Sequence, residues 1–165
     1  MEYTDIHGAR ALRCVADGRV LTLGELHDGM YSRRLLGDGY AVMAAGGMAA
    51  RLTEQLLSPA EVEILSPADG VVTSAEEFLS IRTGDGIGVT VYLGNTGAEF
   101  IPQVGERLRC GERLCTVPRE ALRNNGINGA AVVLFNDMER VTELHISTGR
   151  KKAGDRTAFY RLRGM

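Results

Sequence analysis

Ile64-Leu-Ser-Pro-Ala-Asp-Gly-Val-Val72 is the most informative stretch of this chain, because it places Ala-Asp-Gly directly before a β-branched run. The same signature occurs 52 residues earlier, where Asp17-Gly18 separates two short apolar runs between Arg10 and Leu26. An Asp-Gly pair between apolar runs is typical of a turn between two strands. We therefore expect a hairpin around Asp17 and a second β-structure of the same kind around Asp69.

A second pair of similar segments lies further along the chain. Gly105-Glu-Arg-Leu-Arg-Cys-Gly-Glu-Arg113 is similar to Gly149-Arg-Lys-Lys-Ala-Gly-Asp-Arg156. Two paired repeats predict an internally duplicated all-β domain. The alternative is chance similarity, because Asp-Gly and Gly-Glu are ordinary turn pairs. The 21 glycines and the absence of tryptophan favour many tight turns between short strands.

The middle of the chain gives the clearest individual elements. Residues 78–83, the turn Gly84-Asp-Gly86 and residues 87–93 indicate a hairpin. Val89, Val91 and Leu93 alternate along its second strand, so Tyr92 should point to the opposite face.

Other segments predict one or two short helices and a buried strand. Residues 118–126 combine a proline start with an Asn-Gly stop and indicate a short helix, and 130–135 indicate a buried strand. The stripe Met48, Leu52 and Leu56 indicates a possible second helix, which would pack on the domain or dock a partner.

Composition bounds the class of protein. The 165 residues and 17.8 kDa fit one domain, and 19 basic against 21 acidic residues disfavour binding to nucleic acid. The first seven residues lack the pattern of a signal peptide, and no stretch approaches the roughly 18 apolar residues of a membrane span. We expect a cytoplasmic protein with no direct membrane insertion. Cys14, Cys110 and Cys115 indicate neither a disulfide framework nor a zinc site, and we expect buried thiols.

The run Leu23-Gly-Glu-Leu-His-Asp-Gly-Met-Tyr-Ser-Arg-Arg-Leu-Leu-Gly-Asp-Gly-Tyr-Ala-Val42 resembles, without a gap, the glucose-type enzyme IIA domain of the bacterial phosphoenolpyruvate-dependent sugar phosphotransferase system. Residues 66–70, 81–86 and 104–163 also resemble that family, so the similarity covers about Leu12 to the C-terminus. The resemblance implies an antiparallel β-sandwich or flattened barrel with a duplicated hybrid motif. It also implies an N-terminal extension at 1–9, an enzyme IIA-like domain at 10–165 and an inserted segment at about 43–61.

Both histidines on which the family's chemistry depends are missing. The family's phosphate-accepting histidine falls at Tyr92, in Tyr92-Leu93-Gly94, and its supporting histidine falls nearest Glu77 in a shortened loop. A phenol with a pKa of about 10 is a weak nucleophile without an adjacent base, and a phosphotyrosine ester is too stable to pass phosphate onward. A carboxylate at Glu77 would repel phosphate. We therefore expect a catalytically silent domain.

The remaining histidines provide one alternative. His27, beside Asp28, is the only plausible substitute nucleophile, although a His-Asp pair in a loop is more often a turn contact. His7 lies in the N-terminal extension, and His145 is more simply a strand residue. The alternative function is thus a divergent phosphocarrier that uses His27 or Glu77. We expect no cofactor and no metal, since neither the zinc ligands of a peptidoglycan metallopeptidase nor the lysine hairpin of a lipoyl carrier is present.

The resemblance further implies a partner-binding surface around the lost histidines. In the family this surface binds HPr, sugar permease domains and regulated transporters or enzymes. Carried over by position, it consists here of Asp28, Met30, Tyr31, Leu35, Leu36, Phe78, Thr90 and Tyr92. Met30, Tyr31 and Phe78 would form an adaptable apolar patch of the kind found at interfaces, while Leu35 and Leu36 fit a core position equally well.

Overall fold

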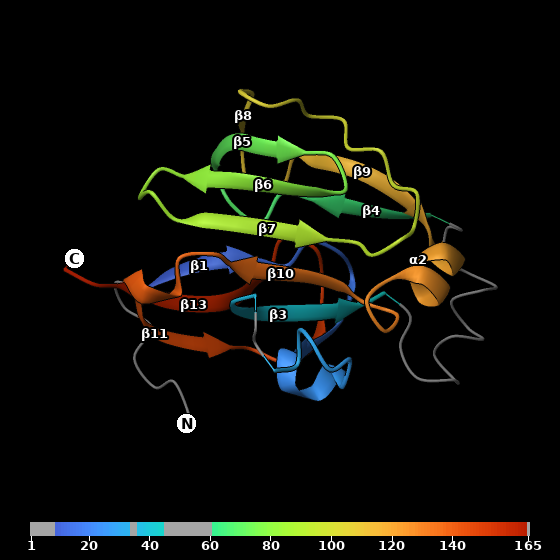
Figure 1. Ribbon diagram of the computed structural model, residues 1–165, viewed down its shortest axis with the longest axis horizontal. Coiled ribbons are helices and arrows are strands. Elements are labelled where there is room, and N and C mark those ends of the chain that lie inside the picture. The colour runs from blue at the N-terminus through green and yellow to red at the C-terminus, as the bar shows by residue number, and fades with distance from the viewer. Residues whose placement is uncertain (1–8, 34–35, 45–60, 165) are drawn as a thin grey trace.

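The computed structural model describes residues 9–33, 36–44 and 61–164, and in these residues the chain is an antiparallel β-sandwich (Figure 1). The largest sheet has eight strands, in the spatial order β12 (Gly149–Lys151), β2 (Gly18–Thr22), β3 (Asp38–Met43), β10 (Ala131–Phe135), β7 (Gly88–Tyr92), β6 (Phe78–Thr83), β5 (Gly70–Ala75) and β8 (Arg107–Leu108). Two smaller sheets complete the fold. They are β1 (Arg10–Arg13), β13 (Arg156–Leu162) and β11 (Val141–Ile146), and the pair β4 (Glu61–Leu65) and β9 (Arg113–Pro118). The expected all-β sandwich is confirmed, and the described strands do not close into a barrel.

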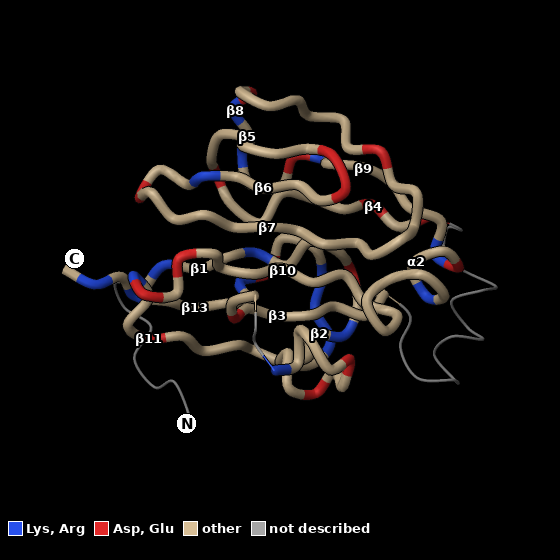
Figure 2. The backbone as a smooth tube through the Cα atoms, in the orientation of Figure 1, with Lys and Arg blue, Asp and Glu red and all other residues tan. Residues whose placement is uncertain are grey.

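The β6–β7 hairpin has the predicted faces. Phe78 pairs with Tyr92 and Ile81 pairs with Val89 across the two strands. Val89 and Val91 lie in the large core between the sheets, while Tyr92 lies against a smaller apolar cluster on the other face of the eight-stranded sheet. The central strands β7 and β10 carry no charged residue, and charges gather on the loops and outer strands (Figure 2).

The hairpin expected around Asp17 is wrong. β1 pairs with β13 in the three-stranded sheet, whereas β2 pairs with β3 and β12 in the eight-stranded sheet. The residues that connect β1 to β2, Cys14, Val15 and Ala16, are completely buried. The chain therefore crosses through the core from one sheet to another before the Asp17-Gly18 turn. The turn signal was correct, but it marks a corner between sheets.

The predicted duplication is visible in these corners. The segment from β4 to β5 repeats the course from β1 to β2, since β4 pairs with β9 and β5 lies in the eight-stranded sheet. The two corners bond each other reciprocally: the Arg13 amide donates to the Pro67 carbonyl, and the Leu65 amide donates to the Val15 carbonyl, both at 2.8 Å. Each of these bonds becomes the other when the 52-residue shift is applied.

The aspartates of the two repeated turns also have equivalent partners. Asp17 Oδ1 accepts the Ala153 amide at 2.8 Å, and Asp69 Oδ1 accepts the Cys110 amide at 2.6 Å. Cys110 and Ala153 occupy matching places in the second pair of similar segments. Each Ala-Asp-Gly corner is thus hydrogen-bonded to one copy of the second repeated segment. The duplication therefore extends to individual hydrogen bonds.

The described residues also form short helices. The predicted helix is α2 (Arg119–Asn125), which ends at Gly126. Two short 3-10 helices, η1 (Leu23–Leu26) and η2 (Met138–Arg140), were not predicted. No helix in the described ranges is long and apolar enough to cross a membrane. The stripe of Met48, Leu52 and Leu56, most of the 43–61 insertion and residues 1–8 lie outside the described residues.

Candidate functional site

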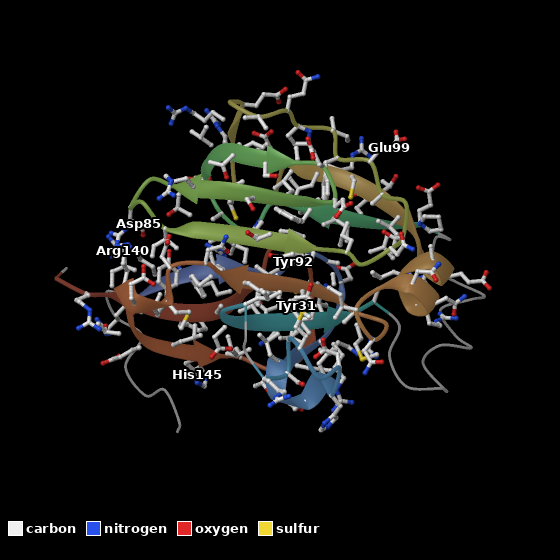
Figure 3. All side chains as sticks on the ribbon, viewed as in Figure 1. Tyr31, Asp85, Tyr92, Glu99, Arg140 and His145 are labelled. Atoms are coloured by element: carbon white, nitrogen blue, oxygen red, sulfur yellow. The ribbon has the colours of Figure 1, made fainter. Side chains whose placement is uncertain are left out.

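Three aromatic rings meet at the end of the β6–β7 hairpin. Phe78 begins β6 and Tyr92 ends β7, and their ring centroids are 5.3 Å apart. Tyr31 comes from the loop after η1 and meets Tyr92 edge to face, with centroids 5.5 Å apart and an interplanar angle of 63°. Figure 3 shows Tyr31 directly beside Tyr92. All three rings are partly exposed. We call this group, together with Met30, the aromatic patch.

Local sequence brings Tyr31 to this position. The Glu25 carboxylate accepts the Thr22 amide at 3.1 Å and the Thr22 hydroxyl at 2.9 Å, which fixes the start of η1. Leu23 and Leu26 are buried in the smaller apolar cluster, so η1 covers part of the outer sheet face. Asn128 holds the end of η1 by donating from Nδ2 to the Leu26 carbonyl at 2.6 Å.

Asp28 organises the turn that carries Tyr31. Its two carboxylate oxygens accept the Tyr31 amide at 3.0 Å and the Ser32 amide at 2.7 Å. Burial raises the pKa of Asp28, but these hydrogen bonds outweigh burial, and the net pKa lies below its ordinary value. Asp28 is thus ionised at neutral pH and supports the patch from below, with its oxygens engaged by backbone.

Of the other residues predicted to form the rim, some are exposed and one is buried. Met30 is 50% exposed and Leu36 is 45% exposed, so both offer apolar surface beside the rings' loop. Thr90, in contrast, is 0% exposed. Leu35 is outside the described residues.

The buried hydroxyl of Thr90 is satisfied by a polar network. It lies 2.7 Å from the Ser80 hydroxyl on β6 and accepts from Asn136 Nδ2 at 2.9 Å. Asn136 follows β10, so the network joins three adjacent strands. The sequence did not identify this network, since Ser80 and Asn136 carry no motif and meet only through strand pairing. The sheet face beside Tyr92 therefore combines the smaller apolar cluster with one hydrogen-bonded polar network around Thr90.

The phenols of the patch are held in their protonated form. Burial raises the pKa of Tyr92. Burial, followed by the neighbouring Tyr92 and Asp28, raises the pKa of Tyr31. An oxygen that is more difficult to ionise than ordinary tyrosine is a poor nucleophile at neutral pH.

Glu77 and His27, which the sequence suggested as alternative nucleophiles, are both exposed. Glu77 lies in the turn between β5 and β6 and lines a shallow pocket with Glu76 and residues 94–98. His27 ends η1 in the left-handed conformation, with φ of 56°. His145 lies on β11, in another sheet, with its ring 6.4 Å from that of Phe159 (Figure 3). His7 is outside the described residues.

Two further sequence predictions concern the cysteines and metal binding. Cys14 and Cys115 are buried as expected, but Cys110 is exposed, because it lies in a surface turn tied to Asp69. No three His, Cys, Asp or Glu side chains of the described ranges gather closely enough to hold a metal ion.

One family recurs among the comparisons with known proteins. The family described as "phosphoenolpyruvate-dependent sugar phosphotransferase system, EIIA 1" matches residues 10–141. The chain is 28% identical over 142 residues to the PTS system glucose-specific EIICBA component of Streptococcus pneumoniae. The aligned region covers 80% of this chain and 18% of that protein. It is 22% identical over 153 residues to the PTS system glucose-specific EIIA component of Mycoplasma capricolum, covering 87% of this chain and 90% of that protein.

A solved structure supports the fold. The glucose permease IIA from Mycoplasma capricolum superposes with a TM-score of 0.71, covering 96% of this chain and 99% of that one at 21% identity. The chain spans less than a fifth of the Streptococcus relative and nearly all of the Mycoplasma relative.

Proposed function

Because the chain belongs to the EIIA 1 family of the phosphoenolpyruvate-dependent sugar phosphotransferase system, we propose that it serves sugar transport by binding a protein partner through the aromatic patch, without carrying phosphate itself. The observation that carries the proposal is the packing of Tyr31 and Phe78 against the protonated phenol of Tyr92. By the family resemblance, Tyr92 occupies the position of the phosphate-accepting histidine. We further place this activity in the cytoplasm and assign it to an enzyme IIA-like domain at residues 10–165.

The chemistry of the patch argues against a relay. A hydroxyl nucleophile needs an adjacent base or a lowered pKa. The pKa of Tyr92 is raised by burial, and its ring lies against those of Tyr31 and Phe78. A phosphotyrosine ester, once formed, would also be too stable to pass its phosphoryl group to a sugar. Tyr92 therefore serves this surface as a rigid aromatic side chain.

The same features suit protein binding. Large aromatic side chains provide contact area with little loss of conformational freedom, and methionine adapts to the shape of its partner. The edge-to-face contact of Tyr31 on Tyr92 and the Asp28 turn hold the rings before a partner arrives. The family resemblance suggests HPr, a sugar permease domain, or a regulated transporter or enzyme as the partner.

A phosphotransfer experiment tests catalytic silence. The full chain is incubated with phosphoenolpyruvate, enzyme I and HPr, and its intact mass is compared with that of a glucose-type enzyme IIA domain that keeps both histidines. We expect the control to gain one phosphate and this chain to gain none. A gain of phosphate on this chain would refute silence, and its loss in His27→Ala or Glu77→Gln would identify the carrier of the alternative function.

A binding experiment tests the patch. Met30→Asp and Tyr31→Ala should weaken binding to HPr or to a permease domain by at least about fivefold, since truncating an interface anchor costs more than about 1 kcal/mol. Val104→Asp is the matched control, because Val104 is an apolar residue that is 65% exposed on the loop before β8. Equal affinities of the three variants would show that the partner binds elsewhere.

A further inference from the structure

Three arginines line one groove at the opposite end of the β6–β7 hairpin from Tyr92. The groove has a volume of about 540 Å³ and is lined by Arg82 of β6 and by Arg107 and Arg109 of β8 and the turn that follows. All three side chains are exposed. Basic positions lie on β6 and on β8, with β5 between these strands (Figure 2). The groove is of the size that small-molecule sites have, about 300–1,000 Å³.

Strand register places the guanidinium groups on one face. Val71 of β5 pairs with Arg82 on one side and with Arg107 on the other. Residues directly opposite each other across neighbouring strands point to the same face, so two arginines flank one valine. Arg109 comes directly after β8 and lines the same groove. The arrangement gives an apolar floor with three cations around it.

These cations are not neutralised by neighbours. Among the described residues, no carboxylate lies within ion-pair distance of Arg82, Arg107 or Arg109. Asp69 also lines the groove, with its Oδ1 accepting the Cys110 amide at 2.6 Å, so three cations face one carboxylate. Arg82 donates one bond to the Gly86 carbonyl at 2.7 Å, which steadies its side chain and leaves its other donors available.

The duplicated half of the chain provides an internal comparison. There the row equivalent to Arg82–Val71–Arg107 is Met43–Arg19–Arg150, so its β3 position is apolar. The pocket beside that row is lined by four acidic and four basic residues, so its charges balance. They are Asp17, Glu61, Glu63 and Asp155, and Arg119, Arg150, Lys151 and Lys152. The repeat therefore does not require an uncompensated arginine cluster. Basic residues occur in both halves, since Arg150 and Lys152 match Arg107 and Arg109, but the groove of the second half is lined by a single carboxylate, that of Asp69.

We propose that this groove binds a small phosphate-bearing anion through Arg82, Arg107 and Arg109. Guanidinium groups form bidentate, charge-assisted bonds with phosphate oxygens, and three of them match a dianion. Val71 would pack against the organic part of a phosphomonoester. This binding activity is independent of the aromatic patch and of the proposed protein partner.

The test is a titration of the full chain with glycerol phosphate and, separately, with inorganic phosphate, at constant ionic strength, followed by backbone amide resonances. We expect saturable shifts at residues 70–73, 82–84 and 107–109. Arg82→Gln and Arg107→Gln should each weaken binding about tenfold, the equivalent of about 1.4 kcal/mol, because each loses its charge-assisted bonds to phosphate. Tighter binding of glycerol phosphate identifies a phosphomonoester as the ligand, and tighter binding of inorganic phosphate identifies the free anion.

Arg156→Gln is the control, because Arg156 is an exposed arginine on β13, in the three-stranded sheet. It should leave the affinity unchanged, and thermal unfolding confirms that each variant is folded. The absence of saturable shifts with both probes would overturn the proposal, as would an equal loss of affinity in Arg156→Gln. Sedimentation with anionic phospholipid vesicles that needs Arg82 and Arg107, without saturable binding of either probe, would assign the groove to a lipid surface and would also overturn it.

Discussion

At the scale of single residues, the patch depends on Asp28 more than on any catalytic group. Both of its oxygens accept backbone amides of the loop that presents Tyr31. The His-Asp pair that suggested a nucleophile in the sequence thus has its carboxylate engaged in the turn. His27 is exposed, and its backbone adopts the left-handed conformation that ends η1.

Lowering the pH should release this loop. The pKa of folded Asp28 lies below its usual value of 3.8, so its hydrogen bonds contribute stability above pH 3.8 and are lost as the pH falls through the lowered pKa. We expect the carboxyl resonance of Asp28 to titrate below pH 3.8, together with a shift of the Tyr31 ring resonances. Asp28→Asn, which cannot ionise, should remove this titration. A midpoint above 3.8 would contradict the role given to the two backbone bonds.

At the scale of elements, Gly94 lies just after β7, and its backbone packs against the end of α2. Gly94 and Gly97 both have positive φ, 68° and 74°, but only Gly94 faces a neighbour. A Cβ at Gly94 would lie 2.4 Å from the Asn125 carbonyl oxygen and 2.8 Å from the Gly126 Cα, whereas one at Gly97 would meet nothing within 4 Å. The two positions therefore separate backbone strain from steric overlap.

Alanine at each glycine tests this contact. Gly97→Ala should lower the free energy of unfolding by about 1–2 kcal/mol, the cost of a left-handed conformation. Gly94→Ala should cost a further 1–3 kcal/mol or so, because backbone atoms of α2 must move. Urea unfolding of the two variants measures the difference. Equal losses would show that α2 moves away from β7 without cost.

The elements that sequence could predict are those with local signals. The β6–β7 hairpin and α2 carry alternation, a glycine turn and a proline start within a few residues. The path from β1 to β2 could not be predicted, since the partners of Cys14 and Val15 lie at Asp155 and Leu65. The family resemblance alone placed Thr90 on the rim, and no local signal showed that its hydroxyl would bond to Asn136, which follows another strand.

At the scale of the whole molecule, two recurring sequence signatures predicted the architecture because they mark its equivalent corners. The meeting of Tyr31 with Tyr92 had no such local signal, and only the family resemblance suggested it. The two surfaces proposed to bind ligands lie apart on the molecule. The aromatic patch lies at one end of the β6–β7 hairpin and the arginine groove at the other, on strands that share a single large core.

That shared core predicts that the sheets unfold together. Cys14, between β1 and β2, and Cys115, on the two-stranded sheet, both lie in the large core cluster. Burial raises the pKa of both thiols, to about 12 for Cys115. In a Cys110→Ser background, which removes the exposed thiol, each should react with a thiol reagent only after global unfolding, and with the same dependence on urea.

The dependence on pH has a defined sign. Because the folded pKa of Cys115 is raised above the ordinary 9.0 to about 12, the unfolded state loses its proton first, and stability should fall as the pH rises above 9.0.

Single-thiol variants that keep either Cys14 or Cys115 measure the thiol reactivity of the two sites separately. If Cys115 reacts at low urea while Cys14 stays protected, then β4 and β9 open as a unit of their own. In that case the two corners that bond each other through Arg13 and Leu65 do not hold the sheets together.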